Sequence, residues 1–481
     1  MIEMRLADVA AVTGGRLHRA TGEERVASVE FDSRAVGPGA LFLALPGERA
    51  DGHAFAAAAV AAGASGVLAG REVDAPAVVV PPAPPGGHFA RTYLAANDPD
   101  GSGAAVLAAL AALAAHAVRS LPATAVVGVT GSSGKTTTKD LLAAVLAPLG
   151  PTVAPPGSFN NELGLPWTAL RAGADTRHLV LEFSARGPGH IAALAAAVPP
   201  RVAAVLNVGS AHLGEFGSRA AVARAKGELV EALPADGVAV LNADDPAVAA
   251  MAERTAARVV RFGLGTGTGP DPVVRAEDVE LHAGRARFTL VAPTGSAPVA
   301  LRLVGAHQVG NALAAAAVAL ELGGDPAGVA AALSAAEPGS RWRMEVTDRP
   351  DGVTVVNDAY NANPESMRAA LSALVAIAGP RRSWAVLGTM AELGADAAAA
   401  HADIARAARD LGVDRLVEVG AAGYAGAHRV DDAAAAIALL RAELEEGDVV
   451  LVKASRAVGL DRVATALLEP GRLDTRGVAA R

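Results

Sequence analysis

The sequence contains no cysteine, so it excludes disulfide bonds and thiolate chemistry. It has no basic tract, and its net charge of −8 makes nucleic acid an unfavourable partner. The first residues carry acids instead of a signal-peptide core, and the most apolar stretch, 103–118, is rich in alanine and short for a bilayer span. These absences predict a cytoplasmic protein without membrane insertion.

Lysine is almost absent as well. Only Lys135, Lys139, Lys226 and Lys453 remain among 42 basic residues. Arginine replaces a solvated lysine easily, but it cannot replace a compact ammonium in a phosphate loop or an amine that must lose its proton. The remaining lysines are therefore candidates for function. Asparagine is also scarce, and most asparagines fall in the segments singled out below.

A glycine-rich loop at 130–136 (TGSSGKT) lies between a strand-like apolar run and a helix-forming run. Glycines let backbone N–H groups turn toward a phosphate, and the helix N-terminus adds a positive dipole end. Lys135 adds a charge, and the Thr136 hydroxyl is a ligand for Mg²⁺. The longer G-x-x-x-x-G-K-[ST] pattern is not met, because its first position falls on Val129. We interpret the segment as a shortened P-loop; a plain turn before a helix is the alternative.

Strand-like and helix-like segments alternate along most of the chain, which is typical of α/β domains with mostly parallel sheets. A length of 481 residues suits two to four domains. We predict a small α/β module over 1–102, ending in a loop at 81–102, and a central P-loop domain over 103–338 with a β excursion at 263–300. A Rossmann-like domain is predicted over 339–481.

Polar residues follow the predicted strands, among them Glu182, Asn242 and Asp358. Ligands of open parallel sheets bind outside the carboxyl ends of the strands, at the same edge as the P-loop. Glu182 is therefore expected to bind Mg²⁺. His212, just beyond another strand, is a candidate for a second ion, although a lone histidine is more often structural.

Lys226 is harder to interpret, because an ammonium would repel Mg²⁺. Reaction with CO₂ would turn its amine into a carbamate, which is an acidic metal ligand. A surface lysine is the alternative. In the N-terminal module, Asp32, Ser33, Arg34 and His53 stand at element ends, where either ligand contacts or ordinary turn and cap residues are found.

A series of motifs from residue 31 to residue 456 resembles, in order, the Mur ligases. The motifs are 31–34 (FDSR), 51–53 (DGH), 130–136 (TGSSGKT), 158–166 (SFNNELGLP), 211–213 (AHL), 225–228 (AKGE), 305–311 (GAHQVGN), 357–366 (NDAYNANPES), 388–394 (GTMAELG) and 453–456 (KASR). Each match is weak alone, but this order is specific.

The resemblance implies an ATP-dependent ligase that activates a carboxylate as an acyl phosphate. The segments 211–214 (AHLG) and 360–364 (YNANP) favour the branch that joins D-alanyl-D-alanine to UDP-N-acetylmuramoyl-tripeptide in peptidoglycan precursor synthesis. The amino-acid-adding sister enzymes usually carry Asp-His-Leu-Asp and Tyr-Ala-His-x-Pro there, and they are the closest alternative. Folylpolyglutamate synthase, which lacks the UDP-binding module, is another, and a P-loop switch protein is a third.

The resemblance also implies ATP, two Mg²⁺ ions, a carbamate on Lys226 and a monomeric enzyme, with the UDP substrate on the N-terminal module. The implied nucleotide contacts are Thr130, Gly131, Ser132, Ser133, Gly134, Lys135, Thr136, Thr137, Asn242, His307, Asn311, Arg343 (or Arg341 in its place) and Asp358. The implied substrate contacts are Ser33, Arg34, Asp51, His53, Asn160, Asn161, Ser184, Asn361 and Asn363. Metal binding falls to Thr136, Glu182, His212 and Lys226, and catalysis to Lys135, Glu182, His212, Lys226 and Asp358.

Overall fold

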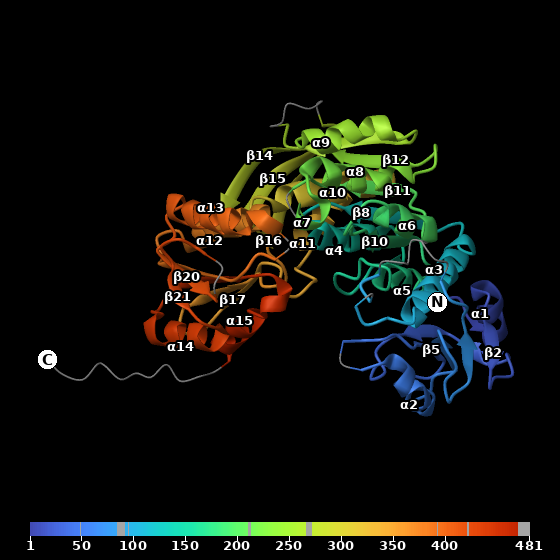
Figure 1. Cartoon of the computed structure of the whole chain (residues 1–481). Helices are drawn as coiled ribbons and strands as arrows, with labels where there is room; N and C mark the ends of the chain where they lie inside the picture. Colours follow the sequence, from blue (N-terminus) through green and yellow to red (C-terminus); the bar gives the residue numbers. More distant parts are fainter. Residues whose placement is uncertain are drawn as a thin grey trace.

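The computed structural model describes residues 1–48, 50–83, 92–94, 96–209, 213–265, 272–391, 393–420 and 423–469. The chain is an α/β protein with mostly parallel sheets, which confirms the predicted fold class. In Figure 1 the C-terminal part (orange and red) lies to the left of the central part (green and yellow), and the N-terminal part (blue) lies below the central part at the right.

The N-terminal part contains short elements: β1 (Met4–Arg5), α1 (Leu6–Thr13), β2 (Arg16–His18), β3 (Arg25–Val26), β4 (Ser28–Glu30), β5 (Ala40–Leu43), η1 (Gly52–Phe55), α2 (Ala56–Ala61), β6 (Gly66–Ala69) and β7 (Ala77–Val79). They form a sheet with the order β2-β7-β6-β5-β4, parallel except for β2, and a separate β1–β3 pair. Successive side chains of β5 point to opposite faces, so Leu41 and Leu43 join the core beneath α1 while Phe42 packs toward α2.

The central part begins with α3 (Ser102–Arg119). It continues with β8 (Ala125–Thr130), α4 (Lys135–Leu146), η2 (Ala147–Leu149), β9 (Thr152–Val153), α5 (Gly164–Ala169), β10 (His178–Glu182), α6 (His190–Ala197), β11 (Val202–Val205), α7 (Leu213–Phe216), α8 (Arg219–Glu231), β12 (Val238–Asn242), α9 (Pro246–Ala249), η3 (Ala250–Arg254) and β13 (Arg258–Gly263). These strands are parallel to one another, in the order β13-β12-β11-β8-β10-β9. Burial on both faces explains why β8, β10 and β11 read as continuous apolar runs.

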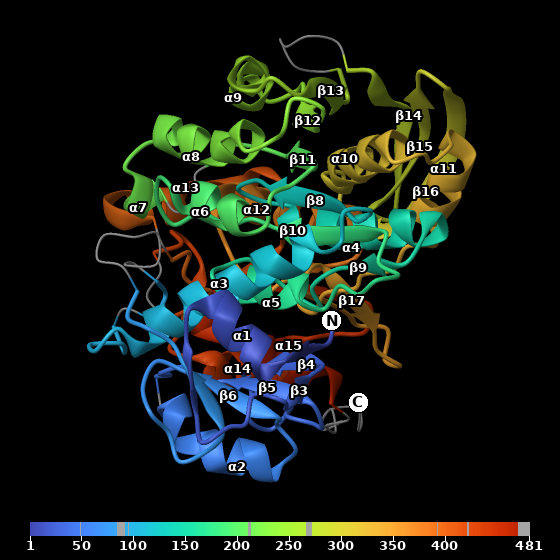
Figure 2. The same ribbon diagram turned by 90° about the vertical axis from the view of Figure 1, so that its right-hand side faces the viewer.

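Helix α3 joins the N-terminal and central parts. It packs against α1 on one side and against α5 and α6 on the other (Figure 2). Among the described helices it alone is long and apolar enough to cross a membrane by length and composition, but 61% of it is buried inside the protein. That burial is the behaviour of a core helix. The predicted boundary at 102/103 falls at its start and stays a prediction.

The predicted β excursion continues the central sheet. It comprises β14 (Val274–His282), β15 (Arg285–Ala292) and β16 (Gly295–Val304), followed by α10 (Gln308–Glu321) and α11 (Pro326–Ala335). β14 pairs parallel with β13, and β15 and β16 then add antiparallel strands, giving nine strands in all. One face of β16 is buried at alternate residues, because α11 covers that face only.

The C-terminal part contains β17 (Glu345–Asp348), β18 (Thr354–Asn357), α12 (Pro364–Ala378), β19 (Ser383–Leu387), η4 (Gly394–Asp396), α13 (Ala397–Asp410), β20 (Arg415–Val419), β21 (His428–Val430), α14 (Ala433–Glu443), β22 (Val449–Lys453), η5 (Arg456–Val458) and α15 (Asp461–Leu468). Its sheet has the order β17-β18-β22-β19-β20-β21, antiparallel only at β17. α12 and α13 cover one face, and α14 and α15 cover the other (Figure 1). This is the predicted Rossmann-like arrangement.

The connection between the central and C-terminal parts is sharply bent. Trp342 and Met344 both have positive φ, 59° and 50°, which non-glycine residues rarely adopt. The Trp342 ring is covered by the guanidinium of Arg456 at 3.9 Å, and the backbone N–H of Met344 donates to Asp358 Oδ1 at 3.1 Å. Contacts with the C-terminal part therefore hold both residues in this conformation.

Candidate active site

The P-loop connects β8 to α4 at the carboxyl edge of the central sheet. Gly134, at the N-terminus of α4, has a φ of 81°, and a Cβ at this position would lie 2.4 Å from Asn311 Oδ1. Glycine is required there both by the backbone conformation and by the space. Lys135 Nζ donates to the carbonyl of Gly131 at 2.7 Å, so the lysine folds over the loop.

Asn207, two residues after β11, fixes the shape of the loop. Its Oδ1 accepts hydrogen bonds from the backbone N–H groups of Ser132 and Ser133, both at 3.0 Å. Its Nδ2 donates to the Ser133 carbonyl at 3.2 Å. The side-chain amide of Asn207 therefore binds both N–H groups and a carbonyl group of the loop backbone.

A polar network surrounds the Thr136 hydroxyl. Its Oγ1 lies 3.0 Å from Glu182 Oε2, 2.7 Å from Ser158 Oγ and 3.2 Å from Arg343 Nη2. The other carboxylate oxygen of Glu182 accepts from Asn160 Nδ2 at 2.8 Å. Glu182 is only 1% exposed, so these contacts compensate a carboxylate that is withdrawn from water.

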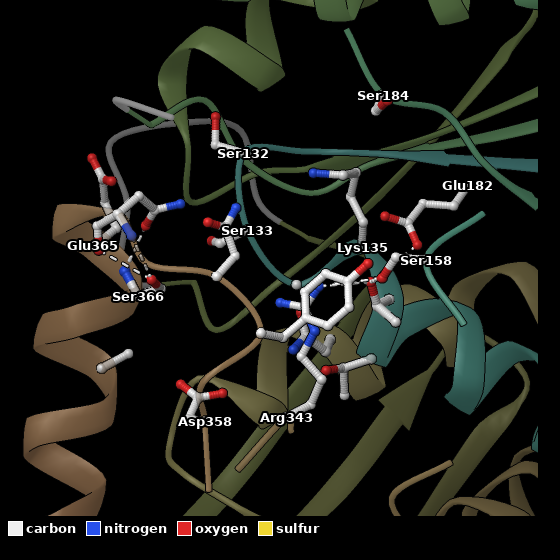
Figure 3. A pocket seen from close by; sticks show the side chains of 18 of the residues that line it. Ser132, Ser133, Lys135, Ser158, Glu182, Ser184, Arg343, Asp358, Glu365 and Ser366 are labelled. Atoms are coloured by element: carbon white, nitrogen blue, oxygen red, sulfur yellow. Dashed lines mark hydrogen bonds between the residues drawn. The ribbon is translucent and has the colours of Figure 1, made fainter. Parts of the chain in front are cut away.

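The C-terminal part faces this network. Figure 3 shows Lys135, Ser158 and Glu182 on one side, Asp358, Glu365 and Ser366 on the other, and Arg343 below and between them. Lys453 Nζ bonds Asp358 Oδ2 at 2.6 Å and the Asn361 carbonyl at 2.8 Å. Arg343 also stacks on the Tyr360 ring at 4.1 Å. The two parts therefore present cations and carboxylates to one shared space.

This space is a cavity of about 530 Å³. Most of the residues implied by the resemblance line it: Ser132, Ser133, Gly134, Lys135, Thr136, Thr137, Asn160, Asn161, Glu182, Ser184, His307, Asn311, Arg343, Asp358, Asn361 and Asn363. Some of them also serve the fold. Asn363 caps α12 through Ser366, and Asn161 Oδ1 accepts from the backbone of Leu163 and Gly164.

Three predicted nucleotide contacts do not line this cavity. Thr130 donates its hydroxyl to the buried Phe183 carbonyl, Gly131 lies at the base of the loop, and Asn242 Nδ2 donates to the Leu206 carbonyl at the end of β12. Arg343, and not Arg341, reaches the cavity; Arg341 lines a separate hollow beside Trp342. His307, at the N-terminus of α10, is exposed and lines the cavity.

Lys226 is on α8 and is 6% exposed. Burial, with a smaller contribution from the charge of Lys135, holds the pKa of its amine well below the ordinary 10.5. His212 lies outside the described residues. Within the described ranges no group of three or more His, Cys, Asp or Glu side chains is arranged to hold a metal ion.

The four predicted substrate residues of the N-terminal part lie apart from the cavity. Ser33 stands in the turn where Asp32 pairs with Arg34, and Asp51 pairs with His53 Nδ1 at 2.7 Å and with Arg71. An aromatic cluster links this module to the 158–161 loop, because Phe31 packs on both Phe159 and Trp167 with ring centroids 5.9 and 5.5 Å apart. The N-terminal module therefore contacts the 158–161 loop, which lines the cavity.

Several cavity residues were not assigned from the sequence, namely Tyr93, Ser158, Arg186, Asn207, Gln308, Tyr360 and Lys453. The scarcity of asparagine and lysine was a usable signal for Asn207 and Lys453. Tyr93 comes from the predicted 81–102 loop, where nothing in the sequence marks it.

A P-loop on a mostly parallel sheet, facing a Rossmann-like domain across one cavity, defines the class: a nucleotide-using P-loop enzyme. Three family models match in order, "Mur ligase family, catalytic domain" over 25–116, "Mur ligase middle domain" over 129–319 and "Mur ligase, glutamate ligase domain" over 342–456. The chain belongs to the Mur ligase family, which confirms the resemblance.

Individual proteins of this family are similar to the chain over nearly its whole length. The UDP-N-acetylmuramoyl-tripeptide–D-alanyl-D-alanine ligase of Mycobacterium tuberculosis is 56% identical, covering 97% of this chain and 98% of that protein. The UDP-N-acetylmuramoylalanyl-D-glutamyl-2,6-diaminopimelate–D-alanyl-D-alanyl ligase of Acinetobacter baumannii has a similar structure, with a TM-score of 0.80 at 31% identity over 97% of this chain and 98% of that one. The MurF ligase of Thermotoga maritima, solved in complex with ADP, gives a TM-score of 0.77 at 30% identity over 94% and 98%.

Proposed function

We propose that the chain joins D-alanyl-D-alanine to UDP-N-acetylmuramoyl-tripeptide, using ATP and an acyl-phosphate intermediate. The observation that carries this is the shared cavity, where the P-loop and Glu182 of the central part face Asp358, Asn361 and Lys453 of the C-terminal part. A ligase of this kind must hold a nucleotide, a carboxylate and an amine together, and a cavity between two domains offers walls for all three.

The first step brings two anions together, the terminal carboxylate of the substrate and the γ-phosphate of ATP. Two unit charges about 4 Å apart repel by roughly 4 kcal/mol at an effective dielectric of about 20. Lys135, Arg343 and Lys453 place three cations on the cavity wall and lower this repulsion. Phosphoryl transfer gives ADP and the acyl phosphate. The amine then attacks the acyl carbon, and the C–O bond to phosphate breaks to leave the amide, inorganic phosphate and a proton.

The donor atoms beside the P-loop fit Mg²⁺. Thr136 Oγ1 and Glu182 Oε2 are hard oxygen ligands 3.0 Å apart in a buried site. We assign them to one ion, and His212 with carbamylated Lys226 to a second. Bound Mg²⁺ would neutralise phosphate charge and stabilise the phosphoryl group during transfer.

Lys226 fits the carbamate because only a neutral amine attacks CO₂, releasing one proton as the carbamate forms. The lowered pKa of Lys226 increases the share of neutral amine that can react with CO₂. A buried lysine with a lowered pKa also contributes less positive charge to a phosphate site than an ordinary lysine does, which favours the carbamate role.

The remaining assignments follow from position and from the family. We assign the nucleotide to the P-loop, Asn242, His307, Asn311, Arg343 and Asp358, the peptide to Asn160, Asn161, Ser184, Asn361 and Asn363, and the UDP end to Ser33, Arg34, Asp51 and His53. We further propose a cytoplasmic monomer, since one chain supplies every assigned residue. Light scattering should give a mass near 47.8 kDa, and twice that value would contradict the monomer.

The deciding experiment measures phosphate release from ATP. Release should require UDP-N-acetylmuramoyl-tripeptide and D-alanyl-D-alanine together. Dependence on a free amino acid would select an amino-acid-adding ligase, and dependence on a folate would select a folylpolyglutamate synthase. ATP hydrolysis that depends on none of these substrates would indicate a P-loop switch protein.

The carbamate has its own test in Lys226→Ala. Activity should collapse and return in part with a small added carboxylate such as acetate. Arg224→Ala is the matched control, because Arg224 is exposed on the same helix. Full activity of Lys226→Ala would show the carbamate role to be wrong.

A further inference from the structure

One arginine of the cavity wall has no role in the scheme above. Arg186 comes four residues after Glu182, and its side chain is 35% exposed in the cavity lining. Its Nη2 donates to both carboxylate oxygens of Glu162, at 3.0 and 2.8 Å. No acceptor among the described residues takes a hydrogen bond from its Nε or Nη1. Part of a fixed guanidinium is therefore available to a ligand.

Glu162 is built to hold this arginine. Its side chain is 3% exposed, and its Oε1 also accepts from the backbone N–H of Tyr93 at 3.1 Å. His190 Nε2 lies 3.5 Å from the other oxygen. A buried carboxylate surrounded by these groups is costly to move, so the guanidinium keeps its orientation before any ligand arrives.

Tyr93 completes the subsite. Its ring centroid lies 6.0 Å from the Arg186 guanidinium carbon, and Tyr93 lines the same cavity. Burial raises the pKa of its phenol to about 12, so the hydroxyl remains a hydrogen-bond donor at neutral pH. An arginine edge with unused N–H donors suits a carboxylate.

The subsite is also near the reacting groups. Ser184 donates to the Asn160 carbonyl at 3.0 Å, and Asn160 bonds Glu182, so a short chain of contacts joins the two places. Glu182 and Arg186 are four residues apart in the sequence, so their Cα atoms are at most about 14 Å apart. The peptide named for the Acinetobacter relative contains glutamyl and 2,6-diaminopimelate residues, and each keeps one carboxylate that does not react. The two carboxyl carbons of a seven-carbon diacid are at most about 7.5 Å apart, because six C–C bonds of about 1.52 Å join them in a zigzag.

We propose that Arg186, oriented by Glu162 and flanked by Tyr93, binds a non-reacting carboxylate of the peptide on the UDP substrate. The inference rests on the proposed function. The carboxylate belongs either to the glutamyl residue or to the side chain of the third residue, and the chemistry of recognition is the same for both.

The test compares Arg186→Gln with wild type on two UDP-tripeptides, one with diaminopimelate and one with lysine in third place. KM and the calorimetric Kd for the diaminopimelate substrate should rise about 10- to 100-fold, as expected when a charge-assisted hydrogen bond is lost. KM for ATP should change less than about 3-fold, which a general structural defect would not allow. Arg177→Gln is the matched control, because Arg177 is exposed at the opposite end of β10.

The two substrates distinguish which carboxylate of the peptide Arg186 binds. If the third residue supplies the carboxylate, wild type prefers diaminopimelate and Arg186→Gln loses that preference; if the glutamyl residue supplies it, both substrates weaken equally. The double variant Glu162→Gln/Arg186→Gln removes both charges, so it leaves no unpaired buried carboxylate. It replaces the single variant in the same measurements if Arg186→Gln does not fold. Unchanged KM and Kd in a folded Arg186 variant of an active enzyme would overturn this inference alone. A wild type that neither binds nor ligates the UDP-peptide would overturn the proposed function, and this inference with it.

Discussion

Replacing Asn207 with aspartate tests how the P-loop recognises phosphate. Asn207→Asp keeps the side-chain shape and the oxygen that accepts from Ser132 and Ser133. It replaces the amide that donates to the Ser133 carbonyl with a second oxygen, and it adds a full negative charge. The variant should therefore fold, with a modest loss of stability from one broken hydrogen bond, about 1 kcal/mol.

The larger effect falls on nucleotide binding. The N–H groups of Ser132 and Ser133 already donate to the oxygen at position 207, so the phosphate would be held by the N–H groups that follow them in the loop, roughly 6 Å from the new carboxylate. At an effective dielectric of about 20, one pair of unit charges at this separation costs about 3 kcal/mol. This predicts a Kd for ADP raised about 100-fold.

Calorimetric titration with ADP and with AMP checks the reasoning. AMP lacks the phosphate that the loop is expected to hold, so its Kd should change far less than that of ADP. Added salt should narrow the difference, because the effect is electrostatic. If ADP binds the folded variant as tightly as wild type, Asn207 does not border the phosphates and the loop assignment fails.

Three further results are expected. Gly134→Ala should lower the free energy of unfolding by about 1–3 kcal/mol and weaken ADP binding, since its Cβ meets Asn311 at a positive φ; a neutral result in urea unfolding would contradict this loop conformation. Hydrogen bonds from Ser383, first from its backbone N–H, hold the pKa of Asp414 below the ordinary 3.8. Because the folded pKa is the lower one, the stabilisation is present above pH 3.8 and is lost as the pH falls through the folded value. Asp414 is exposed, so solvent screening keeps the effect small: Asp414→Asn should be about 0.5 kcal/mol less stable at pH 7, and the difference should disappear in acid. Chelation of divalent ions should stop phosphate release, and excess Mg²⁺ should restore it; activity that survives chelation would remove the metal assignment.

The sequence predicted the strands that are buried on both faces. β10, β12 and β18 end within one residue of Glu182, Asn242 and Asp358, where strand ends were predicted, because burial of a strand on both faces produces a continuous apolar run that is visible in the sequence. The edge strands β9, β17 and β21 were missed, since they are two to four residues long and largely unburied. At such an edge, pairing with one neighbour defines the strand, and the residues themselves show no period.

The residues of the candidate site likewise fall into a group that the sequence predicted and a group that it missed. Glu182 and Asp358 were predicted from their positions after strands, because the topology of a parallel sheet brings strand ends to one edge. Arg186 and Tyr93 were missed, since they are far apart in the sequence and line one cavity only in the folded chain. Asn207 also follows a strand of the parallel sheet, but its hydrogen bonds to two N–H groups of the P-loop depend on distances that only the folded backbone provides.

The bent connection at Trp342 and Met344 bears on how the two halves of the cavity can separate. Each left-handed, non-glycine residue costs about 1–3 kcal/mol relative to ordinary backbone, and steric clashes close most of the path from positive to negative φ. A joint of this kind does not swing through a continuous arc. A change in the orientation of the C-terminal part that moves this connection therefore has to break the Arg456 stack on Trp342 or the Met344–Asp358 hydrogen bond. The second contact involves Asp358, which also lines the cavity, so the connection and the candidate site share one residue.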